Sequence, residues 1–216
     1  MQPKSRPSES APSAHERVYK AIRQSVMHGA ARPGQPLTLR GIGQRYDVSM
    51  TPAREAVRRL AAEGALNVSA SGRVTVTELS NERIEELAAI RAMLEPELAC
   101  RALPRAHNAL IDRLQLINGQ MAEVIAKGDA VGYIRTNLEF HRTLYLRAHA
   151  PAMLAMAETV WLQLGPTMRA LYGRMQRTEL PRHHRSIVAC LRSGDEAGLR
   201  LTVRADVTQG LSMLVS

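Results

Sequence analysis

The stretch Leu37–Leu66, LTLRGIGQRYDVSMTPAREAVRRLAAEGAL, decides the fold of the N-terminal part of the chain. Its apolar residues recur at helical spacing in two runs, a short one after Thr38 and a longer one after Ser49 or Thr51. Either Ser49 or Thr51 could cap the helix that the longer run forms. Pro52 fits the first turn of that helix, where its missing N–H costs nothing. The pattern predicts two helices joined by a tight turn.

The flanking residues complete a small domain. Ser13 followed by Glu16 fits a capping box, which predicts another helix ahead of this stretch. After it, residues 65–68 and 74–77 have the composition of two short strands joined by a turn. Three helices and a hairpin over residues 13–77 are typical of a winged helix-turn-helix. In that fold the third helix enters the major groove of DNA and its exposed arginines reach phosphates and bases.

The charge distribution agrees with a polyanionic partner for this domain. The 216-residue chain has a formal net charge of +9, and residues 1–77 hold 12 Lys and Arg against 5 Asp and Glu, whereas residues 78–216 hold 17 against 15. A basic domain beside a nearly neutral one favours nucleic acid as the partner of the first. A solvated basic face is the alternative explanation. The Pro- and Ser-rich residues 1–12 are predicted to form a disordered tail.

Composition excludes several classes of protein. Apolar residues make up 45% of the chain and aromatic residues only 3%, which favours packed helices over a large β-sandwich. The chain has no apolar run long enough to span a membrane and no secretory signal, so we expect no membrane partner. Cys100 and Cys190 lack the CxxC spacing of a cysteine zinc site and suit a reducing cytoplasm, where we expect the protein to be found.

The rest of the chain is predicted to be entirely helical. After a linker at residues 78–81, which is the expected hinge between the two domains, apolar residues recur at helical spacing as far as the C-terminus. Pro104 ends the first of these helices, and Pro166 is expected to kink or break a later one. The fold class is therefore mainly α, with an antiparallel bundle of about six helices over residues 82–216.

Four short motifs give the chain a resemblance to a known family. It resembles the GntR family of bacterial transcription regulators, in the subfamily with an FCD-type (FadR-type) effector domain, from residue 13 to about residue 210. The motifs are Val48-Ser49-x-Thr51-Pro52-x-Arg54-Glu55-Ala56, Arg91-x-x-Leu94-Glu95-Pro96, Asn137-x-x-Phe140-His141 and His184-Arg185-x-Ile187.

The resemblance implies a set of DNA contacts. One lies on the second helix, four at the start of the third, and two in the turn of the hairpin. Met50 departs from the family pattern, because an arginine usually stands there, and this puts one charged DNA contact in doubt. The implied contacts are Arg40, Ser49, Met50, Thr51, Arg54, Gly72 and Arg73.

The resemblance also implies a metal site inside the bundle. Asn137 and His141 are spaced i,i+4 and share one helical face, and His184 and Asp206 lie on later helices. Asn137 stands where the family usually has Asp, and Asp206 stands where it usually has a third His. Two imidazoles with one or two oxygen ligands suit Zn²⁺, Ni²⁺ or Mn²⁺. Taken alone, a histidine on a helix is more often an ordinary core or surface residue.

An open position on such a metal would suit a small carboxylate or hydroxy acid as the effector. Arg91 is the candidate clamp on the other end of the ligand, because a guanidinium binds carboxylates with two parallel hydrogen bonds. The alternative for Arg91 is an i,i+4 ion pair with Glu95.

These features together predict a ligand-responsive transcription regulator, with a repressor favoured. It would bind double-stranded operator DNA as a homodimer, because two-fold symmetry matches two half-sites. One alternative is a DNA-binding protein whose bundle is purely structural and binds no effector. Another is a metal-dependent enzyme, which the absence of a general base beside the motif and of the GxSxG and HExxH motifs disfavours.

Overall fold

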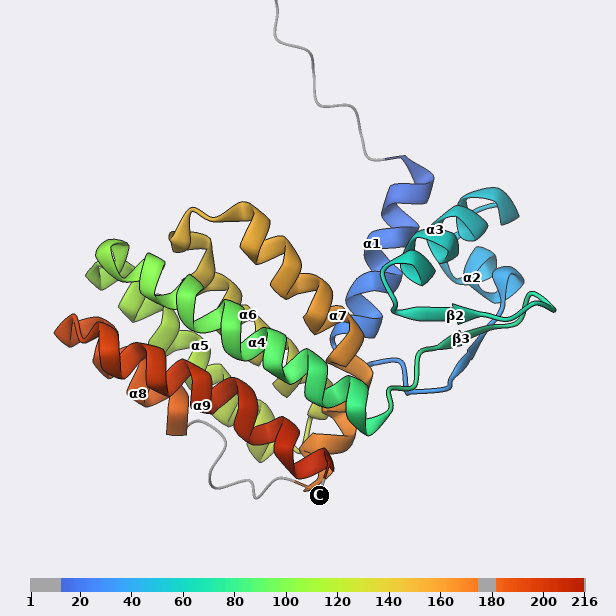
Figure 1. Ribbon diagram of the computed structural model, residues 1–216. Helices are drawn as coiled ribbons and strands as arrows, with labels where there is room; N and C mark the ends of the chain where they lie inside the picture. The colour runs from blue at the N-terminus through green and yellow to red at the C-terminus, as the bar shows by residue number, and fades with distance from the viewer. Residues whose placement is uncertain (1–12, 175–181, 216) are drawn as a thin grey trace, which may run out of the picture.

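The computed structural model describes residues 13–174 and 182–215 of the chain, apart from the side chains of 171, 174 and 209–215. The predicted tail, residues 1–12, lies outside the described residues. The described chain forms a small N-terminal lobe of helices and strands beside a larger helical lobe (Figure 1).

Helices of the N-terminal lobe begin where the sequence supplies a side-chain cap. Ser13 Oγ accepts a hydrogen bond from the N–H of Glu16, and Thr38 Oγ1 accepts one from the N–H of Gly41. Ser49 is the N-cap residue of the third helix, as one of the two predicted alternatives has it, although its side chain makes no capping hydrogen bond. The three helices are α1 (Ala14–Met27), α2 (Leu39–Tyr46) and α3 (Met50–Ala62).

The predicted hairpin is present and belongs to a three-stranded antiparallel sheet. Strands β2 (Leu66–Val68) and β3 (Val74–Val76) pair with each other, and the two-residue strand β1 (Pro36–Leu37) pairs with the other edge of β3. Strand β1 was not predicted, because two residues carry no periodicity of their own. The lobe is a winged helix-turn-helix, as the sequence predicts.

The core of this lobe comes from one face of α1 and one face of α3. Both faces have the i, i+3, i+4 spacing expected of an amphipathic helix. Arg54, Arg58 and Arg59 lie outside the buried face of α3 and are exposed. The fully or nearly fully buried residues are Val18, Ile22, Val26, Ala53, Val57 and Leu60.

The helical lobe contains six helices in the described part of the chain, in agreement with the sequence. They are α4 (Asn81–Ala102), α5 (Asn108–Ala126), α6 (Ala130–Tyr145), α7 (Pro151–Arg174), α8 (Arg182–Ser193) and α9 (Glu196–Val215). Short 3-10 turns follow α4 at Leu103–Arg105 and α6 at Leu146–Ala148. Helices α4 and α9 lie side by side along the lobe (Figure 1).

Pro166 does not break its helix. Helix α7 continues through it to Arg174, although proline cannot donate the usual backbone hydrogen bond. Pro166 and its neighbour Gly165 are both buried, so tertiary packing surrounds the site of the missing bond. Among the described residues, no helix is both long and apolar enough to cross a membrane.

Helix α7 is also the surface on which the N-terminal lobe rests, because α1 packs along it (Figure 1). Arg169 Nη1 donates to the carbonyl oxygen of Gly29 at 3.2 Å, and Gln163 Nε2 donates to that of Glu63 at 3.1 Å. Gly165 lies so close to α1 that a Cβ there would be 2.5 Å from Val26 O. The two lobes therefore meet backbone to backbone at one point.

Candidate functional site

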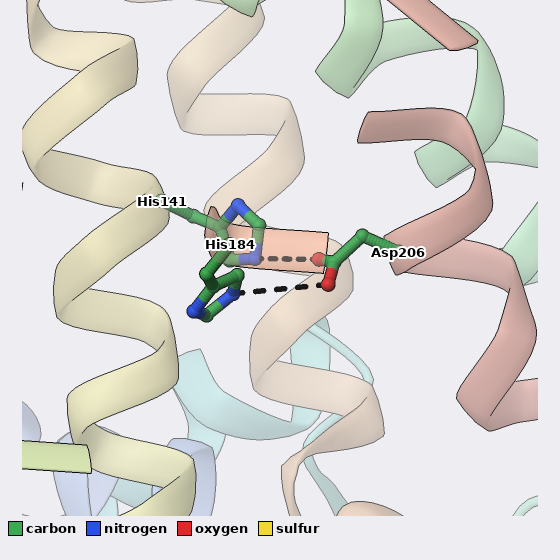
Figure 2. Close-up of side chains that lie close together, drawn as sticks. All are labelled: His141, His184 and Asp206. Carbon is green, nitrogen blue, oxygen red and sulfur yellow. Dashed lines mark ion pairs between the residues drawn. The ribbon is translucent and has the colours of Figure 1, made fainter. Parts of the chain in front are cut away.

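Three of the four predicted metal ligands lie together inside the helical lobe. His141 projects from α6, His184 from α8 and Asp206 from α9, and their ligand atoms all lie within 4.8 Å of one another (Figure 2). His141 Nε2 is 3.0 Å from Asp206 Oδ2, and His184 Nε2 is 3.8 Å from Asp206 Oδ1. Both imidazoles are buried, and the aspartate side chain is 13% exposed.

The ring nitrogens that face Asp206 have no hydrogen-bond partner among the described residues. They are His141 Nε2 and His184 Nε2 (Figure 2). Although His141 Nε2 is near Asp206, the two groups are not aligned for a hydrogen bond. Buried polar atoms are almost always satisfied, so two orphan nitrogens beside a carboxylate point to a missing partner. Two imidazoles and a carboxylate oxygen form a donor set that fits a divalent transition metal.

A buried tyrosine fixes which nitrogen of His141 carries the proton. Burial keeps the pKa of Tyr145 well above its usual value, so its hydroxyl stays protonated. That hydroxyl donates to Glu95 Oε2 at 3.0 Å and lies 3.1 Å from His141 Nδ1. Since its one proton is used on Glu95, Nδ1–H must be the donor to the tyrosine oxygen. Nε2, the nitrogen nearest Asp206, is then the ring atom left to bind a metal.

His184 is held as a neutral imidazole. Its ring stacks on Phe140 with centroids 4.0 Å apart and an interplanar angle of 3°. Burial lowers the pKa of His184 to about 4, with the nearby Asp206 opposing that shift only in part. A neutral imidazole is the form that coordinates a metal.

Asp206 supplies the negative charge of the cluster. Burial by itself would raise the pKa of the carboxyl, but the facing His184 and His141, together with Arg91, lower that pKa overall. The group is therefore an ionised carboxylate at neutral pH. It is the residue that, by the predicted resemblance, stands where the family usually has a histidine.

Asn137, the fourth predicted ligand, lies one turn before His141 on α6 and is half-buried. The described contacts neither join it to the cluster of three nor exclude it. Asn137 therefore stays a prediction as a metal ligand.

Arg91, the predicted effector clamp, is buried in an ion pair with Glu95, one turn further along α4. Its Nε and Nη2 both donate to the Glu95 carboxylate, the second at 3.3 Å. The i,i+4 alternative is thus what the structure shows, and two of the three guanidinium nitrogens are used within the protein. The charge of Arg91 still acts on Asp206, which places it close to the cluster.

Glu95 joins this ion pair to the cluster and was not predicted to do so. Its carboxylate also accepts hydrogen bonds from Tyr145 and from Trp161 Nε1, the latter at 2.9 Å. Burial opposes ionisation of Glu95, but Arg91 lowers its pKa overall. The sequence showed Tyr145 and Trp161 only as aromatic residues, and no local spacing connects either to residue 95.

The predicted DNA contacts occupy exposed positions on the N-terminal lobe. Arg40, Arg54 and Arg73 lie on α2, on α3 and beside the hairpin turn, and all three are exposed. None of them forms an ion pair with the described residues, whereas Arg58 and Arg23 of the same lobe pair with Glu55 and Glu63. The three free guanidinium groups are available to phosphate or base edges.

The remaining predicted contacts surround these arginines. Ser49, Met50 and Thr51 are exposed at the start of α3, with Met50 45% exposed. Gly72 adopts a φ of +80° in the hairpin turn, a conformation that favours glycine, and no atom would approach a Cβ there within 4 Å. A bare, exposed turn of this kind suits a wing lying against DNA.

A winged helix-turn-helix followed by a six-helix domain with an internal metal-ligand cluster defines a class: the two-domain, DNA-binding regulators of transcription. Comparison with known families agrees. The family described as bacterial regulatory proteins, gntR family, matches residues 14–76, and the FCD domain family matches residues 86–209. The chain belongs to the GntR family and carries an FCD domain; its family comprises transcription regulators and not enzymes.

Individual relatives are similar over most of the chain. The HTH-type transcriptional regulator McbR of Escherichia coli K12 is 27% identical over 200 residues, covering 91% of this chain and 90% of McbR. The gluconate operon transcriptional repressor of Bacillus subtilis is 27% identical over 164 residues, covering 76% and 65%. The solved structure of E. coli McbR/YncC superposes with a TM-score of 0.86 at 26% identity, covering 94% and 98%.

Proposed function

We propose that the chain is a repressor that binds operator DNA as a homodimer through residues 13–77 and senses a small carboxylate through residues 82–216, with 78–81 as the linker. Zn²⁺, Ni²⁺ or Mn²⁺ would be held by His141, His184 and Asp206, with Asn137 as a fourth ligand. The observation that carries the proposal is the pair of buried, unpartnered imidazole nitrogens, His141 Nε2 and His184 Nε2, that face one carboxylate.

The bound metal would supply a Lewis acid that coordinates the effector's carboxylate. Among the side chains of the protein, Tyr145 would orient the His141 ring, since its hydroxyl lies 3.1 Å from His141 Nδ1. Because the effector must prefer one arrangement of the DNA-binding domains, its affinity for the protein and the protein's affinity for DNA are linked.

The presence of the metal is tested first, by elemental analysis of the purified, tag-free protein. We expect about one equivalent of Zn, Ni or Mn per chain, and its loss from a His141→Ala/His184→Ala double variant. A His107→Ala/His149→Ala variant is the matched control, since both of those histidines are exposed. Absence of metal after incubation with Zn²⁺ and Ni²⁺ would refute the metal site.

The function is tested by selecting an operator from random duplex DNA and measuring its affinity by fluorescence anisotropy. Citrate serves as a chelating carboxylate probe, added to the metal-loaded and the EDTA-treated protein. A change in operator affinity with the metal-loaded protein alone supports the proposal. Operator binding that no carboxylate alters, with the metal bound or removed, would favour the alternative of a structural bundle without an effector.

A further inference from the structure

Two tyrosines pack together inside the FCD domain and take no part in the proposed metal site. Tyr133 projects from α6 and Tyr172 from α7, and their ring centroids are 5.1 Å apart at an interplanar angle of 34°. Both are more than nine-tenths buried, with 5% and 8% of their surface exposed. They share an apolar cluster with Met121, Ile125 and Ile134, so the side chains packed around the two rings are mostly apolar.

The hydroxyl of Tyr172 lacks the partner that a buried hydroxyl normally has. Its oxygen is almost inaccessible to solvent and forms no hydrogen bond with any described residue. A phenol can both donate and accept a hydrogen bond, and burying one without a partner is unfavourable. A ligand with a polar group at this position would supply the missing partner.

The tyrosine pair is connected to the metal-ligand cluster through α6. Tyr133, Asn137 and His141 follow one another at intervals of four residues, so they occupy successive turns on one side of the helix. Burial raises the pKa of Tyr133, and the charge of Asp206 raises it further, whereas Arg91 opposes the rise. The helix geometry and these two charges together place the hydroxyl of Tyr133 on the cluster's side of the domain interior.

We propose that Tyr172 selects among the carboxylates that the domain accepts, through a hydrogen bond between its hydroxyl and a second polar group of the effector. This inference rests on the proposed carboxylate sensor, because the effector's carboxylate would be held at the cluster. Tyr133 and His141 are two helical turns apart on α6, about 12 Å at 1.5 Å per residue. The second polar group is therefore expected at the end of the effector remote from its carboxylate.

A trapped water molecule is the alternative partner for the Tyr172 hydroxyl. The two explanations differ in what the removal of the hydroxyl does. If the hydroxyl binds the effector, only acids with a polar far end lose affinity when it is removed. If it binds water, acids with a polar and an apolar far end are affected alike.

The test compares acids that differ only at the far end. The acids ω-hydroxyhexanoate and heptanoate have the same length, but the first ends in a hydroxyl and the second in a methyl group; γ-hydroxybutyrate and pentanoate form a shorter pair. Calorimetry measures each Kd with the full-length, metal-loaded chain at constant ionic strength. In at least one pair we expect the hydroxy acid to bind about three- to tenfold more tightly, the contribution of one hydrogen bond.

Variants assign this preference to one hydroxyl. Tyr172→Phe should abolish it, so that both acids of a pair bind with the same Kd. Tyr46→Phe, at a half-buried tyrosine of the DNA-binding domain, is the matched control and should keep the preference. Competition with a chelating dye should give the same metal affinity for both variants and the unaltered chain, so that loss of metal cannot explain a lost preference.

Failure of this inference is distinct from failure of the proposed function. If neither these acids nor citrate bind to the metal-loaded chain, the carboxylate sensor and this inference fall together. If acids bind but the unaltered chain does not prefer the hydroxy acids, or Tyr172→Phe keeps the preference, the inference is overturned and the sensor stands. An equal loss of affinity for both acids of a pair in Tyr172→Phe also overturns it, in favour of a trapped water.

Discussion

Trp161 Nε1 donates a hydrogen bond to Glu95 Oε1 at 2.9 Å, linking α7 to α4 across 66 positions of the sequence. The same carboxylate accepts from Arg91 on its own helix and from Tyr145 on α6. Tyr145 in turn contacts His141 of the metal-ligand cluster. Helix α7 is also the helix against which α1 of the DNA-binding domain packs. The buried Glu95 carboxylate therefore connects the cluster of His141, His184 and Asp206 to the helix that contacts the DNA-binding domain.

The first prediction concerns this carboxylate. Glu95→Gln removes the carboxylate that is ion-paired with the buried Arg91, and we expect it to lower the free energy of unfolding by about 3–5 kcal/mol. Glu97→Gln on the same helix is the matched control. Glu97 forms surface ion pairs with Arg101 and Arg200, so its loss should cost about 1 kcal/mol or less. Urea unfolding followed by circular dichroism compares them, and equal losses would contradict the prediction.

The second prediction concerns the orientation of His141. Tyr145→Phe removes the acceptor of the Nδ1–H proton and frees the ring to adopt the other tautomer. We expect metal affinity to fall about 10- to 100-fold, as for other outer-shell partners of metal ligands. Competition with a chelating dye measures the Kd.

Tyr172→Phe is the control for that experiment. The hydroxyl of Tyr172 is buried without a hydrogen-bond partner among the described residues, so its removal breaks no bond. Its metal affinity should equal that of the unaltered chain. Unchanged affinity in Tyr145→Phe would show that the tautomer of His141 is set in some other way.

The third prediction concerns the contact between the domains. Gly165→Ala places a methyl group against the backbone carbonyl oxygens of Val26 and Met27, which cannot rotate away as a side chain could. We expect a loss of about 1–3 kcal/mol in stability, because α1 must move off α7. Gly119→Ala, where no atom lies within 4 Å of the new Cβ, should instead stabilise α5 by about 0.5–1 kcal/mol. Differential scanning calorimetry distinguishes the two, and stabilisation of both variants would count against close interdomain packing.

The fourth prediction concerns DNA. Arg54→Ala should weaken operator binding and reduce the slope of log K against log salt by about one if the guanidinium contacts a phosphate. Arg58→Ala, on the same exposed side of α3 but paired with Glu55, should change the slope less. Anisotropy titrations between 50 and 200 mM salt, roughly the range in which such slopes are resolved, provide the comparison. An unchanged slope with lower affinity would indicate that Arg54 contacts a base instead.

Much of the fold could be predicted because its signals are local. The side-chain oxygens of Ser13, Thr38 and Ser80 each accept a hydrogen bond from the backbone N–H three residues later. Four consecutive residues are therefore enough to predict where such a helix begins. Strand β1 lacks such a signal, since Pro36 and Leu37 become a strand only by pairing with β3. Helix α7 continues through Pro166, so the proline alone does not mark the end of a helix.

The candidate site divides in the same way. The cluster could be predicted because His141, His184 and Asp206 fit motifs of a known family. The roles of Tyr145 and Trp161 could not, because each depends on a hydrogen bond to a residue at least 50 positions away. For Arg91, the i,i+4 spacing to Glu95 predicted, as the alternative to an effector clamp, the ion pair that the structure contains. The family pattern alone does not show that this pair occupies most of the guanidinium.

Besides the covalent connection through residues 78–81, the DNA-binding domain is held along the length of α7. Hydrogen bonds join Arg23 to Glu158 O, Gln163 to Glu63 O and Arg169 to Gly29 O, and the backbones touch at Gly165. Any rotation of the DNA-binding domain away from α7 would have to break these contacts together. An effector that favours a different placement must therefore supply, from its own binding, the free energy that this whole contact contributes.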